Sequence, residues 1–250
     1  MLQNASQPGG FFVLMSNERL KIALPTGQLE SGVLSFSRAL GLDFDENSRK
    51  YLIEVRNMPL DFVILRASDV PGFVFNERSQ VKAGITGSDI LWEAGYGQNA
   101  GTPLIIDEKE TSKPALFVGV SQELARNIEA EAGRIPTVSD LIGESLATKF
   151  PRIASDYLIG KQVVGVDILP VTGKTEAMQY VYWDCRGILD VVESGRTRDA
   201  NEILELERFH EVTVRMIEAA DKLSSIEKGI LEDLREKIWL RHQVLGGMSA

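Results

Sequence analysis

Residues 190–197 carry the sequence DVVESGRT, in which an apolar run is followed by small residues and then by charged ones. This pattern predicts a strand, a short loop and a helix that begins near Arg198. Glycine in the loop lets backbone N–H groups approach an anion closely, and Ser194 and Thr197 add hydroxyl donors. Because the positive end of the helix dipole faces the loop, the segment predicts a cradle for a phosphate group.

Two carboxylates, those of Asp190 and Glu193, flank the predicted cradle. A carboxylate beside a phosphate is unfavourable unless it binds another group, such as sugar hydroxyls or Mg²⁺. Sugar, phosphate and metal together suggest a ribose-phosphate ligand. The same residues also fit an ordinary connection between a strand and a helix, with a serine or threonine as the N-cap.

The whole chain has the composition of a soluble globular protein. Its 250 residues suffice for one large or two medium domains, and 44% of them are apolar and 25% charged. The net charge of −9, without a basic stripe, argues against nucleic acid as a main partner. Cys185 is the only cysteine, which excludes an internal disulfide and fits a reducing compartment.

The N-terminal residues 1–19 are expected to form a weakly ordered extension. Their apolar patch, residues 11–15, has no basic segment before it, which argues against a signal peptide. No apolar run approaches the length that spans a bilayer. We therefore expect no membrane association and a cytoplasmic location.

Short apolar strands alternate with helical segments along the first hundred residues, which predicts α/β layers with mainly parallel sheets. Helix-start signals, a capping residue or a proline in the first turn, occur at residues 68–71 and 88–89. The expected strands are 20–25, 52–55, 62–65 and 82–86, and the first expected helix is 30–40.

A second set of elements follows a change in composition near residue 100. The expected strands are 116–120, 144–148 and 163–169, with a helical turn at 137–142 and a helix at 152–159. From Asn201 onward we expect a helical tail, which would contain both histidines, His210 and His242. Two histidines in such a tail argue against a His-based metal site or a Ser-His-Asp triad.

Three further patterns give weaker signals. In the tail, Ile226, Ile230, Leu234 and Ile238 repeat every four residues, which is typical of core packing or of a subunit interface and suggests a dimer. Residues 172–175 (TGKT) lack the upstream glycine of a P-loop, so they predict at most an anion-facing turn with Lys174 as a point charge. Residues 178–183 contain an aromatic run that is typical of strand core, with stacking on a base as the alternative (Met178, Tyr180, Tyr182 and Trp183).

Several segments, in the same order, resemble ATP phosphoribosyltransferase, the first enzyme of histidine biosynthesis, in its short form. Residues 147–151 (ATKFP) are similar to the family's ATxYP segment, and residues 190–201 (DVVESGRTRDAN) to its phosphoribosyl-diphosphate loop, D-I-V-x-T-G-x-T-L-x-x-N. The strongest match lies in residues 50–93, where NMPLD (57–61), LR (65–66), DVPG (69–72) and GITG (84–87) resemble NMP-[IL]D, LR, D-[IV]-PG and GI-[TI]-G. The resemblance covers about residues 20–240.

The resemblance implies an α/β fold of two domains, a clamshell like that of periplasmic binding proteins, with the active site in the cleft. Domain I would comprise residues 20–102 and 184–250 and would carry the phosphoribosyl-diphosphate loop. Domain II would comprise residues 103–183, so the chain would cross between the domains twice. The resemblance also implies a separate regulatory subunit that resembles histidyl-tRNA synthetase, and we expect a homodimer or a larger assembly.

The implied reaction joins N1 of ATP to C1 of phosphoribosyl diphosphate and expels diphosphate, with Mg²⁺ bound through the substrate rather than by a side-chain motif. The catalytic candidates are Asp190 and Glu193. The residues implied to bind phosphoribosyl diphosphate are Asp190, Glu193, Ser194, Gly195, Arg196 and Thr197. The residues implied to bind the acceptor are Thr26, Gln28, Arg66, Asp69, Thr86, Lys149, Lys174 and Glu176.

The chain departs from the family pattern mainly on the acceptor side. Residues 25–28 read PTGQ where the family has PKGR, so two cations are missing. A charge-assisted hydrogen bond contributes roughly 1.5–3 kcal/mol, so losing two would weaken binding of a polyphosphate by a factor on the order of 10²–10⁴. The family's FGxC-[RK]-L strand is absent, its ExAP segment matches residues 173–179 only loosely, and Arg198 replaces its leucine.

These departures leave three alternatives open. In the first, the acceptor is ATP, and Lys174, Arg196 and Arg198 replace the lost cations. In the second, the acceptor is a less charged base or heterocycle. In the third, the chain is a binding or regulatory subunit that has lost its catalytic activity. A resemblance of fold alone does not separate them.

Overall fold

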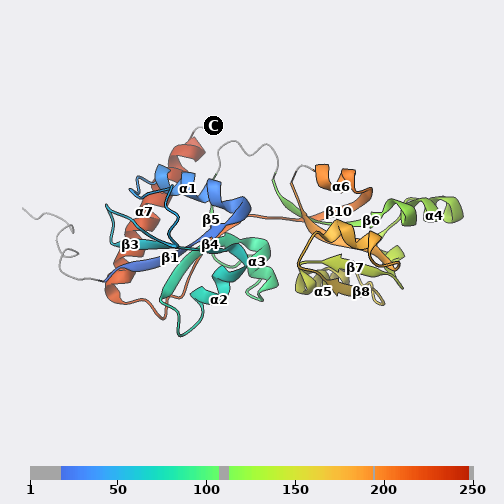
Figure 1. Ribbon diagram of the computed structural model, residues 1–250, viewed down its shortest axis with the longest axis horizontal. Helices are drawn as coiled ribbons and strands as arrows, with labels where there is room; N and C mark the ends of the chain where they lie inside the picture. The colour runs from blue at the N-terminus through green and yellow to red at the C-terminus, as the bar shows by residue number, and fades with distance from the viewer. Residues whose placement is uncertain (1–17, 107–112, 194, 248–250) are drawn as a thin grey trace, which may run out of the picture. The chain divides into compact units, whose positions relative to one another are not determined.

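The computed structural model describes residues 18–106, 113–193 and 195–247, with only the backbone described for Gln28, Thr197 and residues 244–247. The expected extension at residues 1–19 and Ser194 of the cradle therefore lie, wholly or largely, outside the described residues. The chain forms two compact units (Figure 1). Unit 1 comprises residues up to 86, 104–108 and 216 onward, and unit 2 comprises residues 87–103 and 109–215.

Unit 1 is built on a six-stranded sheet with the strand order β2-β3-β1-β4-β11-β5. Strand β1 pairs in parallel with β3 and β4, and β2 pairs antiparallel with β3. The strands are β1 (Leu20–Thr26), β2 (Leu52–Glu54), β3 (Leu60–Arg66), β4 (Val81–Gly87), β5 (Thr102–Leu104) and β11 (Val214–Glu218).

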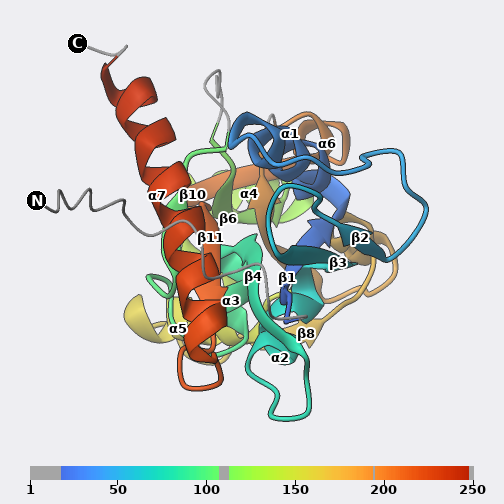
Figure 2. The same ribbon diagram turned by 90° about the vertical axis from the view of Figure 1, so that its left-hand side faces the viewer.

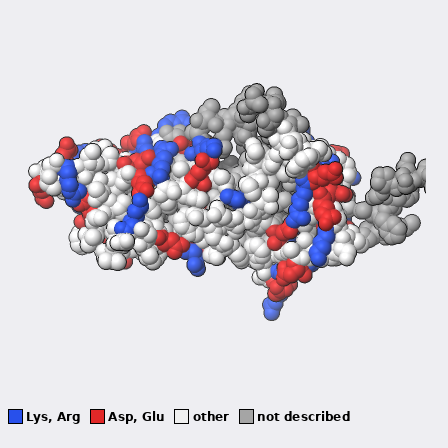
Figure 3. Space-filling model, turned by 180° about the vertical axis from the view of Figure 1, so that it is seen from behind, with Lys and Arg blue, Asp and Glu red and all other residues white. Residues whose placement is uncertain are grey.

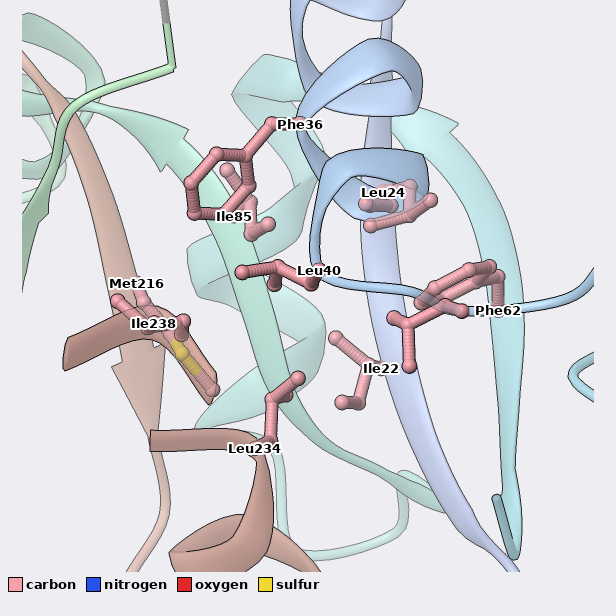
Figure 4. A pocket seen from close by; sticks show the side chains of 11 residues that line it. Ile22, Leu24, Phe36, Leu40, Phe62, Ile85, Met216, Leu234 and Ile238 are labelled. Carbon is pink, nitrogen blue, oxygen red and sulfur yellow. The ribbon is translucent and has the colours of Figure 1, made fainter. Parts of the chain in front are cut away.

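The helices of unit 1 cover both faces of this sheet. Helices α1 (Glu30–Ala39) and α7 (Ser225–Gly247) lie on one face, and Figure 2 shows α7 over β4 and β11. Side chains of both helices point toward the sheet around a small apolar cavity of about 20 Å³ (Figure 4). Helix α2 (Val70–Val74), which follows the short helix η3 (Ala67–Asp69), covers the other face. There a Cβ on Gly84 would lie 2.6 Å from Val70 Cγ1, so glycine permits this close contact.

Unit 2 is built on a five-stranded sheet with the strand order β10-β6-β9-β7-β8. Strands β7, β8 and β9 run parallel, whereas β6 pairs antiparallel with β9 and with β10. The strands are β6 (Ala115–Ser121), β7 (Ser145–Thr148), β8 (Asp167–Pro170), β9 (Cys185–Val192) and β10 (Ile203–Glu211).

The core of unit 2 follows the alternation of side chains along its strands. Leu116, Val118 and Val120 of β6 pack in a cluster with helix α5 (Pro151–Gly160), while Phe117 belongs to a second cluster. Helix α5 starts at a proline, and its first N–H groups donate to Glu93 of α3 (Ser88–Glu93) at 3.1 Å. The remaining helices are η2 (Gly27–Leu29), α4 (Gln122–Ala132), η4 (Val138–Leu141), η5 (Thr175–Tyr180) and α6 (Arg196–Ala200).

The structure confirms the α/β fold class, although both sheets mix parallel and antiparallel pairs. The expected strands at 20–25, 62–65, 82–86, 116–120 and 144–148, and the helices at 30–40 and 152–159, are present within a few residues. The expected strand 163–169 is shorter and starts at Asp167. Helix α4 was not expected.

The expected helical tail from Asn201 is wrong. Residues 203–211 form β10, which pairs with β6, and residues 214–218 form β11 of the other sheet. His210 therefore lies on a strand. Only the last part is helical, as α7, where Ile230, Leu234 and Ile238 are buried and confirm core packing, whereas Ile226 is 37% exposed.

The division into units also differs from the expected domains. Residues 184–215, with the predicted cradle, lie in unit 2. The reason is that β9 pairs with both β6 and β7 at the centre of the second sheet. Residues 87–103 lie in unit 2 as well, where Ser88 Oγ accepts a hydrogen bond from the N–H of Thr213 at 3.0 Å.

Charged side chains of both signs lie close together at the surface. Arg134 and Asp140 form an ion pair at 2.6 Å, and Lys161 pairs with Glu207 at 2.7 Å. On the face shown in Figure 3, basic and acidic side chains are interspersed. Among the described residues, no helix combines the length and the apolar character needed to cross a membrane.

Candidate functional site

Three polar side chains meet where the parallel strands of unit 2 end. Lys149 follows β7, Thr175 lies in η5 after β8, and Asp190 lies near the end of β9. The register pairs Thr148 with Leu189, so Lys149 and Asp190 are level with one another. The carboxyl ends of parallel strands are where α/β proteins usually bind their ligands.

Asp190 is the centre of this group. Its Oδ2 accepts hydrogen bonds from Thr175 Oγ1 at 2.6 Å and from Lys149 Nζ at 3.0 Å. Its Oδ1 accepts a hydrogen bond from the N–H of Val191 at 2.8 Å. Asp190 is 6% exposed, whereas the side chain of Lys149 is 42% exposed. The carboxylate is therefore fixed in direction, and the ammonium retains donors for another group.

The segment after β9 makes the turn that the sequence predicts. Gly195 has a φ of +75°, and α6 begins at the next residue. Glu193 and Arg196 are exposed. Since Ser194 lies outside the described residues and Thr197 is described only in its backbone, the two expected hydroxyl donors stay predictions.

Arg198 packs beneath this turn rather than facing solvent. Its guanidinium forms ion pairs with Asp199 at 2.7 Å and with Glu205 of β10, and its side chain is 19% exposed. Glu205 also accepts a hydrogen bond from Arg208 Nε at 2.8 Å. Arg198 is thus engaged in supporting the turn, which argues against the expectation that it replaces a lost phosphate-binding cation.

Helix η5 connects the strand end to the far end of α6. Lys174, exposed, precedes it, and Glu176 in its first turn is partly buried. Gln179 Nε2 donates a hydrogen bond to the carbonyl oxygen of Asn201 at 2.7 Å. Tyr180 Oη donates to the same oxygen at 3.4 Å. The candidate residues Lys174 and Glu176 therefore lie in a segment that is hydrogen-bonded to Asn201, the residue that directly follows α6.

The sequence suggested that the aromatic run, residues 178–183, is strand core, but it lies in the second half of η5 and in the segment before β9. Tyr180 is 68% exposed, Tyr182 46% and Trp183 87%. Trp183 lies two residues before Cys185, the first residue of β9, and Asp190 lies five residues after Cys185, which is about 17 Å further along the strand. Stacking of Trp183 on a base held beside Asp190 is therefore not supported either.

Asp89, in the first turn of α3, is a second buried carboxyl group in unit 2. Burial raises its pKa above the ordinary value, and the negative charge of Asp190 acts in the same direction. Hydrogen bonds from the backbone N–H groups of Ile90 and Asp89 itself oppose this shift. The carboxyl group of Asp89 therefore interacts electrostatically with the carboxylate of Asp190.

The candidate residues of unit 1 also gather at the carboxyl ends of parallel strands. Thr26 ends β1 and is paired with Arg66 at the end of β3. Arg66 and Asp69 are exposed. Thr86 lies near the end of β4, but it is fully buried and its Oγ1 donates to the carbonyl oxygen of Ala67 at 2.9 Å. The hydroxyl of Thr86 therefore has a structural partner, while Gln28 is described only in its backbone.

A cavity of about 230 Å³ in unit 1 borders Thr26. Arg49 and Lys50 line it, as do Glu30 and Glu46. Sequence reasoning missed these two cations because they stand about twenty residues after the motif that they adjoin in the fold. It also missed Thr175, which lies within the TGKT motif that was considered only for its lysine.

The resemblance implies Mg²⁺ bound through the substrate rather than by a side-chain motif. Among the described residues, no group of three or more His, Cys, Asp or Glu side chains could hold a metal ion. The carboxylate of Asp190 is occupied by three donors, and Glu193 is exposed beside the loop. Mg²⁺ commonly binds through one carboxylate and substrate phosphates. Binding of Mg²⁺ through the substrate, which the resemblance implies, stays a prediction.

The chain is similar to known proteins in sequence and in fold. A sequence profile of the family HisG, described as ATP phosphoribosyltransferase, matches residues 66–239. An ATP phosphoribosyltransferase from Anoxybacillus flavithermus is 30% identical over 201 residues, covering 79% of this chain and 84% of the relative. One from Geobacter metallireducens is 31% identical over 205 residues, covering 79% and 87%.

A solved structure shares the fold. The ATP phosphoribosyl transferase (HisG:HisZ) complex from Thermotoga maritima aligns with a TM-score of 0.64 at 22% identity, covering 88% of this chain and 98% of that one. The profile match spans well over half of the sequence and includes the strand, the turn and η5. The chain belongs to the ATP phosphoribosyltransferase family.

Proposed function

We propose that this protein transfers the 5-phosphoribosyl group from phosphoribosyl diphosphate to N1 of ATP and releases diphosphate. Family membership supports phosphoribosyl transfer. The observation that carries the proposal for this chain is the buried, oriented carboxylate of Asp190 at the start of a glycine turn, with Lys149 beside it.

The segment after β9 would hold the sugar phosphate. Backbone N–H groups of residues 194–197 and the side chain of Arg196 would bind the 5-phosphate, with the hydroxyls of Ser194 and Thr197 as further donors. Asp190, and with it Glu193, would accept hydrogen bonds from the ribose hydroxyls. Because Asp190 already accepts hydrogen bonds from Thr175 and Lys149, its orientation is set before the ligand binds.

The chemistry requires little covalent help from the protein. The bond from C1 to the diphosphate oxygen breaks, the bond from C1 to N1 of the adenine forms, and C1 becomes positive in between. Negative charge from Asp190 and Glu193 favours that positive charge, and positioning of the two substrates supplies most of the remaining acceleration. Mg²⁺ on the diphosphate would make it a better leaving group.

Each unit carries residues at its strand ends that we propose for acceptor binding. Those of unit 1 are Thr26, Gln28, Arg66, Asp69 and Thr86, of which Thr86 contributes through its backbone because its hydroxyl is engaged. Those of unit 2 are Lys149, Lys174 and Glu176. We further propose that Arg49 and Lys50, which share a cavity with Thr26, supply positive charge that residues 26 and 28 lack.

A regulatory subunit resembling histidyl-tRNA synthetase is proposed as a partner, and a homodimer or larger assembly as the state of this chain. The solved Thermotoga maritima protein is a complex of two kinds of subunit, which supports a search for such a partner. Its effect is measurable as a change in turnover when the second protein is added.

The test of the proposed function is release of diphosphate in the presence of Mg²⁺. The expected result is release that requires both ATP and phosphoribosyl diphosphate and that falls strongly in Asp190→Asn. No release with any purine triphosphate, alone or with the regulatory subunit, would refute ATP as the acceptor. If phosphoribosyl diphosphate then raises the melting temperature while ATP does not, ATP is not the acceptor, and either another heterocycle accepts the group or the chain is a binding subunit without turnover.

A further inference from the structure

We infer that Thr175 is a positioning residue for Asp190, and that η5 acts as a brace that sets the direction of this carboxylate. The inference rests on the proposed function, because it assigns Asp190 to the ribose hydroxyls. It adds a residue outside the sugar-phosphate segment, within residues 173–179, which match the family's ExAP segment only loosely.

The first observation is the contact itself. Thr175 is fully buried, and its Oγ1 donates to Asp190 Oδ2 at 2.6 Å. A hydroxyl in this position has no water to bond to, so its hydrogen points at the carboxylate. The bond is charge-assisted, and it acts on the same oxygen as the bond from Lys149. With the N–H of Val191 on the other oxygen, both carboxylate oxygens are held.

The second observation is that the brace is fixed at its other end. Gln179, one helical turn after Thr175, donates to the carbonyl oxygen of Asn201 at 2.7 Å. Asn201 directly follows α6, which is the helix that closes the glycine turn. Helix η5 therefore bonds to the strand before the sugar-phosphate segment and to the chain just after it. A brace fastened on both sides restricts the positions that the segment between them adopts.

The third observation separates the roles of the two donors. The side chain of Lys149 is 42% exposed and has three donors, so it is free to rearrange when a phosphate binds. Thr175 has one donor, no exposure and a stiff β-branched side chain. When the lysine turns toward a ligand, the threonine still holds the carboxylate in place.

The experiment compares five variants, one of them Asp190→Asn, by calorimetric binding of phosphoribosyl diphosphate in Mg²⁺ and by the KM for ATP. Thr175→Val keeps the shape and removes the donor, Thr175→Ala removes the donor without filling the site, and Thr175→Ser keeps the donor. Ser145→Ala is the matched control, since Ser145 is buried in the same sheet and donates to Asp184 at 3.0 Å, at the opposite end of β7.

We expect Thr175→Val to weaken binding of phosphoribosyl diphosphate about tenfold and to lower kcat, with the KM for ATP unchanged. Thr175→Ser should restore binding to within about twofold, and Ser145→Ala should lower the melting temperature without changing binding. If Thr175→Val does not fold, Thr175→Ala carries the same expectation.

Two results would overturn the inference, and they have different consequences for the proposed function. Unchanged binding in Thr175→Val or Thr175→Ala, with weakened binding in Asp190→Asn, removes the role of Thr175 and leaves the proposed function standing. Unchanged binding in Asp190→Asn removes the proposed role of Asp190, and the brace with it.

Discussion

Substitution of Gly195 by alanine tests whether the turn after β9 must keep its observed shape. Gly195 has a φ of +75°, a conformation that residues with a Cβ rarely adopt. A Cβ at this position would lie 2.8 Å from Nη2 and 3.2 Å from Cζ of Arg198. The variant therefore meets a backbone penalty and a steric one.

The free-energy cost of each penalty can be given separately. An L residue in the left-handed region costs about 1–2 kcal/mol. Arg198 has to move aside, but it is ion-paired with Asp199 and Glu205, and loosening such pairs adds about 0.2–1 kcal/mol. The sum is roughly 1–3 kcal/mol, and if the turn distorts to avoid it, phosphoribosyl diphosphate should bind up to about 100-fold more weakly.

The assay is a binding titration with phosphoribosyl diphosphate, paired with a thermal melt. In the double variant Gly195→Ala/Arg198→Leu, the steric penalty should disappear and the backbone penalty should remain. Gly133→Ala is the matched control, since Gly133 also has a positive φ, +64°, but a Cβ there meets nothing within 4 Å. That control should lower stability and leave binding unchanged. Wild-type binding and stability in Gly195→Ala would show that the turn does not need its observed shape.

Three other outcomes follow from burial. Because burial raises the pKa of Asp89, the folded protein binds a proton that the unfolded chain has lost above about pH 4, so stability falls as pH rises through the raised pKa. Asp89→Asn should therefore be stabilising in melts at pH 7 and should lose this advantage near pH 4; an advantage that grows toward low pH contradicts it. Leu234→Ala should cost about 2–5 kcal/mol in urea unfolding, and Ile226→Ala clearly less, since Leu234 is 5% exposed and Ile226 37%; equal costs would refute core packing. Trp183→Ser should change stability by no more than about 0.5 kcal/mol, and a large loss would restore a core role.

Local signals predicted the elements whose ends are marked by glycine, proline or capping residues. Strand β1 ends before a glycine with a φ of +89°, and α5 begins at Pro151. Helix α4 had such signals too, because Ser121 caps its start and Gly133 ends it in a left-handed conformation. It was missed because residues 122–132 are mostly polar, with no buried residue.

The strands β10 and β11 were missed for a different reason. Residues 203–218 alternate apolar and polar side chains in part, but the strong four-residue stripe of α7 follows closely and dominated the interpretation of the tail. Pairing settles the matter, since β10 bonds to β6, about ninety residues earlier. A local sequence pattern around β10 does not include the strand with which β10 pairs.

The candidate site shows the same limit. The strand, the glycine turn and Asp190 were predicted from residues 190–197 alone. Thr175 was not, because its contact with Asp190 depends on three strands lying in register at one edge of a sheet. The same dependence explains why Arg49 and Lys50 were not connected with Thr26 until the fold placed them on one cavity.

The proposed function requires the backbone N–H groups of residues 194–197 to bind the phosphate of phosphoribosyl diphosphate. Amide hydrogen exchange, followed by mass spectrometry with and without phosphoribosyl diphosphate and Mg²⁺, measures this directly. We expect slowed exchange to be centred on residues 194–197 and to be lost in Asp190→Asn. Saturating ligand that slows exchange elsewhere and leaves this segment unchanged would contradict it.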